Sequence, residues 1–419
     1  MQKPPWRWPR RSRVDRVAAD PNEVQRHFDA IVKGAEVAAI PNDDRHIKFE
    51  KLLMNDGKFD GPPINVRDDI ALLQYTGGTT GTPKGAMLTH GNLGSNAEVL
   101  KKFWGWKKGD VLLHALPIFH VHGLFVASHG ALLNGSKMIW LPRLDTKELI
   151  KHMPRSTVMM GVPTFYVRLL LDKEFSKQTV KNMRLFVSGS APLLTETFNL
   201  FKERTGHTIL ERYGMSETVM LVSNPYEGAR VGGSVGVPLP KTQVRITSDD
   251  GKLCGVNQIG SVEVKGPNVF KGYWRMPEKT KEEFTKDGWF KTGDVGRWGG
   301  ETSAGKVPDN YLCIVGRSKD LIISGGYNVY PKEIESFIDE MNGVDESAVI
   351  GVPHPDFGEA VVAVVVSKPG AKLNSDAMIA DLKGKIANFK VPKKVIIVSE
   401  LPRNAMGKVQ KNVLRQTYA

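Results

Sequence analysis

The stretch Tyr75-Thr-Gly-Gly-Thr-Thr-Gly-Thr-Pro-Lys-Gly85 decides how the rest of this chain is interpreted. Its glycines let the backbone take positive φ and approach an anion closely, so that successive N–H groups can form an anion-binding nest. Its threonines add hydroxyl donors, and its lysine adds a full positive charge. These residues are Gly77, Gly78, Gly81, Gly85, Thr79, Thr80, Thr82 and Lys84. The stretch therefore predicts a phosphate-binding loop that follows a strand over residues 71–75.

The loop differs from the P-loop of nucleotide-binding proteins. Pro83 precedes Lys84 and Gly85 follows it, where the P-loop has a glycine and a Mg²⁺-binding hydroxyl. The simplest alternative is an ordinary Gly/Thr-rich loop. The density of glycine, hydroxyl and lysine in one short stretch favours phosphate binding over that alternative.

The loop resembles the signature loop of the adenylate-forming superfamily, which includes acyl-CoA synthetases, luciferases and the adenylation domains of peptide synthetases. That family usually has Ser where this chain has Gly78, a change that removes one hydroxyl donor and leaves the backbone cradle intact. The resemblance implies that the loop binds ATP and that Thr79 takes part in catalysis. The other loop residues that it assigns to ATP are Thr76, Gly77, Gly78, Thr80, Gly81 and Lys84.

Length and composition limit the classes of protein to which the chain can belong. The chain has 419 residues, of which 41% are hydrophobic, enough for about two or three folded units. No apolar run approaches the ~20 residues of a membrane span, and the run Val361–Val366 is a buried strand at most. Two cysteines, Cys254 and Cys313, are too few for a disulfide framework and suit a reducing, cytoplasmic location.

The net charge of +13 suits anionic partners. The basic residues are scattered and accompany no known nucleic-acid motif, so we expect no nucleic-acid partner. Polyanionic small substrates such as ATP and CoA explain the charge equally well.

The N-terminal residues carry few structural signals. We expect a disordered extension over residues 1–13, with a targeting peptide as the alternative, and one amphipathic helix near Pro21 to Val37. A polar linker follows to about Pro63. Compared with the family, the chain is expected to have a shortened N-terminal subdomain and an atypical start over residues 1–63.

Strands and helices alternate from the loop to about Val222, which predicts a parallel sheet flanked by helices. Short β segments after Asn224 predict a distorted β subdomain. The expected fold is α/β and adenylate-forming, with a large domain over residues 1–318 and a small mobile α+β domain over 319–419. The expected elements are a helix from His90, strands at Asp110–Pro117 and 185–188, helices at Phe165–Leu171, Pro331–Glu340 and Asp376–Ala387, strands around Ala348 and Val361, and a basic tail.

A second motif, Glu211-Arg-Tyr-Gly-Met-Ser-Glu-Thr218, follows an expected strand at residues 208–210. Ligands bind at strand ends in open parallel sheets. The resemblance assigns Tyr213 to stacking on adenine, Ser216 to phosphate and Glu217 to Mg²⁺, which favours one or two carboxylates plus phosphate oxygens. It also assigns nucleotide contacts to Ser190, Ala191, Pro192, Glu211, Arg212, Gly214, Met215, Asp294 and Arg317, the last two beside the ribose.

Lys408 lies in Leu401-Pro-Arg-Asn-Ala-Met-Gly-Lys-Val-Gln410 and matches the family's catalytic lysine. In adenylation a carboxylate attacks a phosphate, and a cation between the two anions stabilises the transition state. The alternative is one lysine among many in a basic tail. Acetylation of Lys408 would remove its charge and is a candidate regulatory modification. The resemblance also implies a hinge at Lys319 and a passage for the pantetheine arm of CoA at Gly325 and Gly326.

Several motifs are similar to those of malonyl-CoA synthetases, among them 120–123, 161–168, 188–192, 223–226 and 266–277. A second carboxylate in the acyl pocket needs a fixed cation, and we predict Arg168 for that role, with an exposed position on the outer face of its helix as the alternative. His122, Ser190 and Met215 are expected to line the same pocket. The predicted reaction joins malonate to CoA with ATP, through malonyl-AMP, as a step of fatty acid metabolism. A synthetase for methylmalonate or acetate and a non-catalytic remnant are the alternatives.

Overall fold

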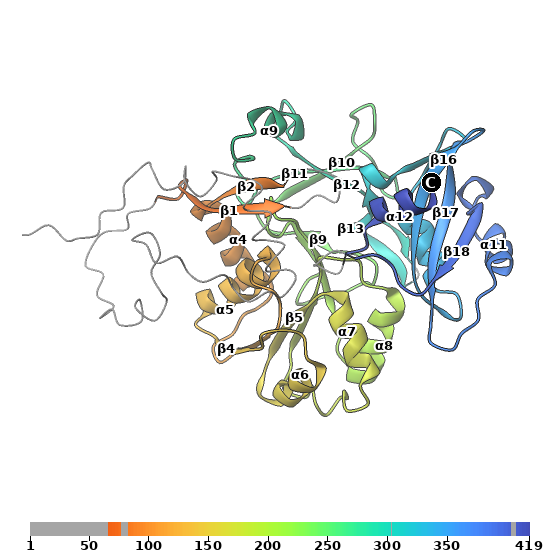
Figure 1. Ribbon diagram of the computed structural model, residues 1–419. Helices are drawn as coiled ribbons and strands as arrows, with labels where there is room; N and C mark the ends of the chain where they lie inside the picture. The colour runs from red at the N-terminus through yellow and green to blue at the C-terminus, as the bar shows by residue number, and fades with distance from the viewer. Residues whose placement is uncertain (1–65, 77–82, 303, 404–407) are drawn as a thin grey trace, which may run out of the picture.

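The computed structural model describes residues 66–76, 83–302, 304–403 and 408–419 (Figure 1). The predicted N-terminal helix and extension lie outside these residues. So do five predicted ATP contacts in the loop, at Gly77, Gly78, Thr79, Thr80 and Gly81, which stay predictions. None of the helices in the described ranges has both the length and the apolar character needed to cross a membrane.

A parallel sheet forms the centre of the large domain, as predicted. Its strand order is β4-β3-β5-β6-β7, and two short antiparallel strands, β8 and β9, extend it. The bounds are β3 Val111–His114, β4 Lys137–Trp140, β5 Val158–Gly161, β6 Leu185–Ser188, β7 Leu210–Tyr213, β8 Val222–Ser223 and β9 Val237–Pro238. Strands β5 and β6 are buried along their whole length, as expected for a sheet covered on both faces.

Helices cover both faces of this sheet. Helices α4 (His90–Phe103) and α5 (His129–Asn134) lie on one side, and α7 (Pro163–Leu171) and α8 (Thr195–Thr205) lie on the other (Figure 1). The predicted helix at His90 is confirmed, and a capping box between Thr89 and Asn92 fixes its start. The remaining short helices here are η1 His122–Ser128, α6 Thr146–His152 and η2 Met153–Arg155.

The strand predicted at residues 208–210 is wrong in position. Strand β7 covers Leu210–Tyr213, because Leu210 and Glu211 pair with β6 while Arg212 and Tyr213 pair with β8. The charged residues of the second motif therefore belong to the strand itself. Successive side chains of a strand point to opposite faces, so Arg212 and its neighbour Glu211 face different sides of the sheet.

The ends of the phosphate loop lie on an antiparallel hairpin. Strand β1 (Ile70–Thr76) confirms the strand predicted before the loop, and it pairs with β2 (Lys84–Thr89). Thr76 stands opposite Lys84, so the loop connects two neighbouring strand ends.

A four-stranded antiparallel sheet, β10-β11-β12-β13, follows. The prediction of short segments is wrong for β12 (Phe290–Thr302) and β13 (Gly305–Arg317), because register shifts at Gly296 and Gly300 accommodate glycines inside long strands. Asp294, predicted in a turn, lies within β12. The other elements are β10 Gln243–Thr247, β11 Gly260–Lys265 and α9 Pro277–Glu283.

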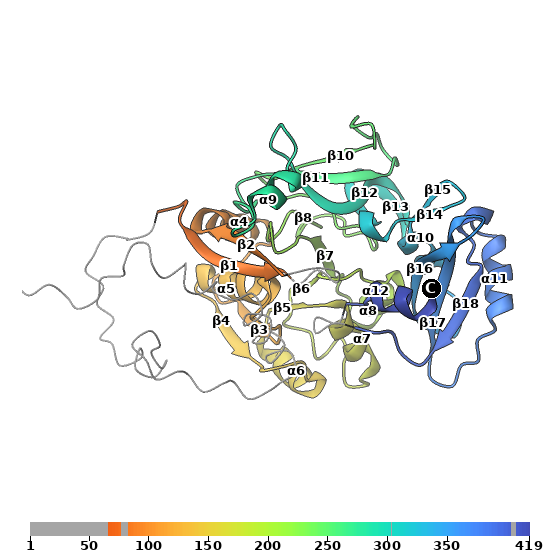
Figure 2. The same ribbon diagram turned by 45° about the horizontal axis from the view of Figure 1, so that its top comes forward.

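The C-terminal sheet, which includes β16, β17 and β18, lies at the right of Figure 2. It has apolar clusters on both faces. In β17 (Gly358–Ser367), Val361, Ala363 and Val365 join one cluster, whereas Val362 and Val364 join the other. The predicted strand at 361–366 and the helix at 331 are confirmed. The other bounds are η3 Ser318–Asp320, β14 Ile322–Ser324, β15 Tyr327–Val329, α10 Pro331–Asp339, β16 Val344–His354, α11 Ser375–Lys383, η4 Asn388–Lys390, β18 Lys394–Val398 and α12 Lys411–Tyr418.

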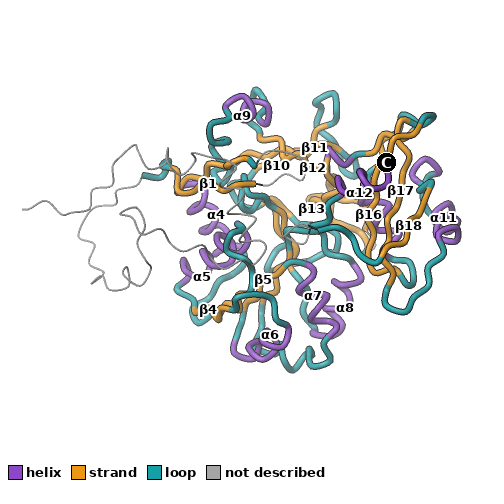
Figure 3. The backbone as a smooth tube through the Cα atoms, viewed as in Figure 1, coloured by secondary structure: helices purple, strands orange, loops and turns teal. Residues whose placement is uncertain are grey.

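The predicted basic tail is wrong, because it contains two packed elements. Strand β18 extends the sheet by pairing in parallel with β17, and helix α12 buries Leu414 in one of the apolar clusters. Helix α12 lies on the side of the sheet that faces the large domain (Figures 1 and 3). Its place brings the end of the chain toward the edge of the parallel sheet.

Candidate active site

A group of polar side chains gathers at the carboxyl edge of the parallel sheet. His122 follows β3, Ser190 follows β6, and Arg212 lies in β7. The Ser190 hydroxyl is 3.3 Å from Nδ1 of His122. The guanidinium of Arg212 packs against Gly189, where an added Cβ would come within 2.3 Å of Nη1. A larger residue at that position would displace the guanidinium from the place it occupies here.

Arg212 is a buried cation. Its exposed fraction is 4%, and Nε and Nη2 have no hydrogen-bond partner among the described residues. Burial lowers its pKa to about 9, so the guanidinium remains charged at neutral pH. A buried charge without a counterion is costly. The site is thus arranged to receive an anion.

The histidines beside Arg212 supply no compensating charge. Burial, with a contribution from Lys408 and then from Arg212, lowers the pKa of His120 to about 3. Burial and Arg212 also hold the pKa of His122 well below its usual value. Both rings are neutral at pH 7. The buried part of the site is therefore polar and net positive.

A second group joins the two sheets of the large domain. Asp294 in β12 stands opposite Arg317 in β13. The Tyr213 hydroxyl donates to Oδ2 of Asp294, and Nε of Arg317 donates to Oδ1 at 2.7 Å. Burial raises the pKa of Asp294 although Arg317 opposes that shift. The structure thus brings together three residues that the sequence assigned to adenine and ribose.

Glu217 is a buried carboxylate that Tyr273 connects to Lys84, the residue that begins β2. It accepts a hydrogen bond of 3.0 Å from Tyr273, whose ring centroid lies 4.4 Å from Nζ of Lys84. Burial raises the pKa of Glu217, and Lys84 is among the groups that oppose the shift. The described residues contain no cluster of three or more His, Cys, Asp or Glu side chains that would hold a metal. A single carboxylate fits Mg²⁺ that takes its other ligands from phosphate oxygens and water.

Lys408 connects the C-terminal domain to both groups. Its side chain retains exposure to solvent. Partial desolvation and then repulsion from Arg317 lower its pKa, while Asp294 and Glu217 oppose the shift. A cation from the small domain therefore stands near the nucleotide group and Arg212 together.

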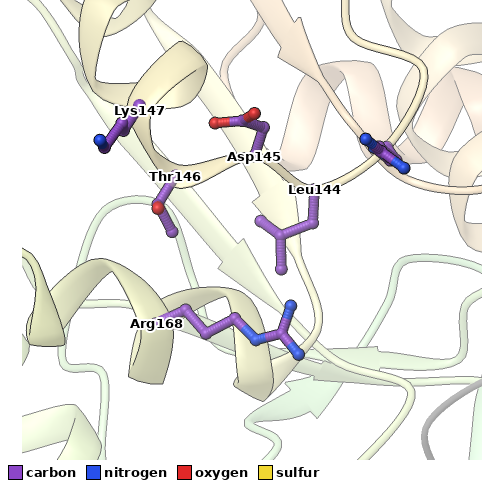
Figure 4. Close-up of a pocket in the computed structure, with 6 residues that line it drawn as sticks. Leu144, Asp145, Thr146, Lys147 and Arg168 are labelled. Carbon is purple, nitrogen blue, oxygen red and sulfur yellow. The ribbon is translucent and has the colours of Figure 1, made fainter.

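Arg168, which was predicted to bind the second carboxylate, lies apart from the buried group around Arg212. Arg168 is exposed on α7 and lines a surface pocket of about 490 Å³ with Arg143, Leu144, Asp145, Thr146 and Lys147 (Figure 4). That lining includes neither His122 nor Arg212. The predicted role of Arg168 stays a prediction, and its exposure favours the alternative, a surface arginine on the outer face of α7.

The remaining predictions concern loops and one strand residue. Gly325 and Gly326 form the exposed turn between β14 and β15, with φ of 58° and 80°, and Lys319 is exposed in η3. Glu211 accepts a hydrogen bond from the Gly233 amide, and burial raises its pKa to about 8. The other residues predicted to contact nucleotide or acid lie in loops after β6 and β7, namely Ala191, Pro192, Gly214, Met215 and Ser216.

Sequence reasoning missed two features of the site. Tyr273 bridges the Lys84 and Glu217 positions, and although it lies in the 266–277 motif, no role was predicted for it. The second feature is the burial of Arg212 beside His122, and the predicted contact of Arg212 with nucleotide stays a prediction. The available signal was the position of Arg212, two residues after the apolar segment Ile209-Leu210, because an arginine that enters the interior usually has an anionic partner.

Known proteins resemble this chain in both sequence and structure. The profile of the AMP-binding enzyme family matches residues 12–274, and that of the AMP-binding enzyme C-terminal domain matches residues 333–408. The solved structure of ATP-bound MatB from Rhodopseudomonas palustris is 56% identical, with a TM-score of 0.81 over 84% of this chain and 69% of that one.

Two curated relatives are equally similar but differ in name. A malonate–CoA ligase of Arabidopsis thaliana is 39% identical over 84% of this chain, which spans 61% of the relative's length. A long-chain-fatty-acid–CoA ligase of Bacillus subtilis is also 39% identical, over 83% of this chain and 62% of its own. Identity alone therefore does not choose the acid.

Proposed function

Because the chain belongs to the AMP-binding enzyme family and has the adenylate-forming fold, we propose that it joins an acid to CoA with ATP, and that the acid is malonate. The observation that carries the choice of acid is the buried guanidinium of Arg212, whose Nε and Nη2 find no partner among the described residues. The chain spans 61% of the length of the first curated relative, so activity and substrate are both proposals.

The first half-reaction is adenylation. A carboxylate oxygen of malonate attacks the α-phosphorus of ATP, the bond to diphosphate breaks, and malonyl-AMP forms. Lys408 lies between the two anionic groups and stabilises the charge that develops at the phosphate. Lys84 and the loop of residues 77–82 hold the departing phosphates.

The nucleoside is held by the group around β12 and β13. Asp294 accepts hydrogen bonds from the ribose hydroxyls, and Arg317 fixes the carboxylate that does so. Tyr213 offers its ring to adenine. Glu217 would hold Mg²⁺ together with phosphate oxygens, and the ion would neutralise charge on the phosphates.

The second half-reaction transfers the acyl group. The CoA thiolate attacks the acyl carbon of malonyl-AMP, and the acyl C–O bond breaks, so that AMP leaves with the carboxylate oxygen.

Arg212 argues for a dicarboxylate. The distal carboxylate of malonate would pair with its guanidinium, while a long alkyl chain in the same place would leave the cation buried and unpaired. Ser190 and His122 offer polar contacts to the same group. The pocket therefore suits a short diacid better than a fatty acid.

ATP–pyrophosphate exchange over a panel of acids tests the proposal. We expect exchange to be fastest with malonate, slower with methylmalonate because its extra methyl group must fit beside Met215, and weak with acetate and palmitate. Fastest exchange with acetate or palmitate would overturn the diacid assignment. Absence of exchange with every acid would support the non-catalytic alternative.

We also propose that Lys319 lets the small domain rotate, so that Gly325 and Gly326 replace Lys408 at the site. Lys319 lies in η3, between the last strand of one sheet and the first strand of the next. Lys319→Pro fixes φ and should spare adenylation but reduce thioester formation. Unchanged thioester formation from supplied malonyl-AMP would place the hinge elsewhere.

We also propose a cytoplasmic location, because the cysteines suit a reducing compartment. Cys254 and Cys313 are both free thiols.

A further inference from the structure

The segment that carries Lys408 is anchored at its base by the residues around it. Arg403 and Val409 form an antiparallel bridge, and the Gln410 amide donates to the carbonyl of Pro402 at 2.8 Å. Leu401 on one side and Leu414 on the other are buried in the same apolar cluster. The residues before and after Lys408 are therefore held together at one place on the C-terminal domain, and that place is the base of the Lys408 segment.

An ion pair ties this base to α10. Lys411, three residues after Lys408, pairs with Oε1 of Glu335, and the same oxygen accepts a hydrogen bond of 2.9 Å from the Val349 amide. Glu335 is only 6% exposed. Burial disfavours its ionisation, but Lys411 and then Lys332 outweigh burial and lower the pKa of Glu335. The carboxylate is thus charged and held from two sides.

A second ion pair lies one turn further along α12. Arg415 pairs with Asp320 of η3 at 2.8 Å. Lys411 and Arg415 are four residues apart and share a face of the helix. The first turn of α12, immediately after Lys408, is therefore oriented by Glu335, while its second turn is oriented by the segment next to Lys319.

We propose that Glu335 is a positioning residue for adenylation, because it holds Lys411 and so fixes the place of Lys408 over the site. The inference rests on the proposed function. Glu335 touches neither substrate nor nucleotide in this account. Its effect passes through Lys411 and the base of the Lys408 segment.

The expected signature is a difference between the two half-reactions. Lys408 stands near Asp294, Glu217 and Arg212. In the proposed function adenylation takes place there, and the proposed acyl transfer to CoA does not use Lys408. Displacing a reacting group by about 1 Å can cost about 100-fold in rate. A loss of general stability would instead lower both half-reactions together.

Glu335→Gln is the test, because Gln keeps an acceptor for the Val349 amide and removes only the charge. We expect ATP–pyrophosphate exchange to fall about 100-fold and thioester formation from supplied malonyl-AMP to stay unchanged. The matched control is Glu333→Gln on the same helix, whose partner Lys390, 2.7 Å away, belongs to η4. It should leave exchange unchanged.

Reversing the charges of the Lys411–Glu335 ion pair gives a second test of the proposal. Lys411→Glu alone should lose exchange, and Lys411→Glu combined with Glu335→Lys should regain part of it. An equal loss in both half-reactions, or no loss in Glu335→Gln, would overturn the proposal.

Hydrogen exchange of the full chain separates this inference from the proposed function. In Glu335→Gln the Gln410 amide should exchange faster, while the buried strand β17 keeps its protection. This measurement needs no substrate, so it remains decisive if the wild-type chain adenylates no acid. Unaltered protection of Gln410 would show that Glu335 does not hold the Lys408 segment.

Discussion

Lys408→Ala is expected to lower malonate-dependent ATP–pyrophosphate exchange by about 100- to 1,000-fold, the range seen when a preorganised charge-stabilising group is removed from a transition state. The lysine lies near Asp294, Glu217 and Arg212, where the carboxylate and the α-phosphate must meet. Without its charge the two anions repel each other in a partly desolvated site. Acetylation of Lys408 removes the same charge and should have the same effect.

Acyl transfer serves as the internal control for this variant. With malonyl-AMP and CoA supplied, Lys408→Ala should form malonyl-CoA at the wild-type rate, because the second half-reaction does not require the lysine. Comparable losses in both half-reactions would mean that Lys408 supports the fold or acts generally. Lys408→Arg keeps a cation with a different shape and should retain part of the exchange activity.

Arg212→Leu is expected to lower kcat/KM for malonate by roughly 30-fold to several thousand-fold, which corresponds to ~2–5 kcal/mol for a buried charged partner. The distal carboxylate would enter a buried site without a counterion. Because Nε and Nη2 of Arg212 have no hydrogen-bond partner among the described residues, the substitution leaves no partner of these two atoms unpaired, and the variant is expected to fold. Propionate lacks the second carboxylate and should lose little activity or gain some.

Two controls accompany Arg212→Leu. Arg212→Lys keeps the charge but not the paired N–H groups and should give an intermediate loss. Arg168→Ala removes an exposed arginine, and an exposed ion pair contributes about 0–1 kcal/mol, so its loss for malonate should be less than tenfold. A larger loss in Arg168→Ala than in Arg212→Leu would indicate that Arg168, and not Arg212, binds the distal carboxylate of malonate. Equal losses for malonate and propionate in Arg212→Leu would assign Arg212 a structural role.

Local patterns predicted the elements whose side chains are uniformly buried. The apolar run at Val361–Val366 and the apolar strand segments before Val222 are typical of strands that are covered on both faces of a sheet. Helix α4 was predictable because Thr89 and Asn92 cap its first turn. These signals lie within a few residues of one another along the chain.

The errors have non-local causes. Strand β7 extends to Tyr213 because β8 pairs with it, and the glycines of β12 are tolerated because β13 takes up the register shifts. Helix α12 has few apolar residues and was read as a basic tail, yet Lys411 and Arg415 find acidic partners on α10 and η3. The charge pattern alone does not reveal those partners.

Some residues of the candidate site were also predictable from local motifs, whereas the role of others depends on contacts between distant parts of the chain. Tyr213, Asp294 and Arg317 were assigned by motif, and the structure brings them into one hydrogen-bonded group. The role proposed for Arg212 depends on its burial, which accompanies the pairing of β7 with its neighbouring strands and has no local pattern. The choice between Arg168 and Arg212 is therefore a structural inference and not a sequence prediction.

The central claim is that the carboxylate of malonate attacks the α-phosphorus of ATP at this site, and an isotope label follows that bond directly. Malonate labelled with ¹⁸O in its carboxylates is incubated with the chain, ATP, Mg²⁺ and CoA, and the nucleotide product is analysed by mass spectrometry. The account predicts AMP that carries one ¹⁸O from malonate, formed together with malonyl-CoA and diphosphate. Unlabelled AMP, or ADP with the label in inorganic phosphate, would contradict it.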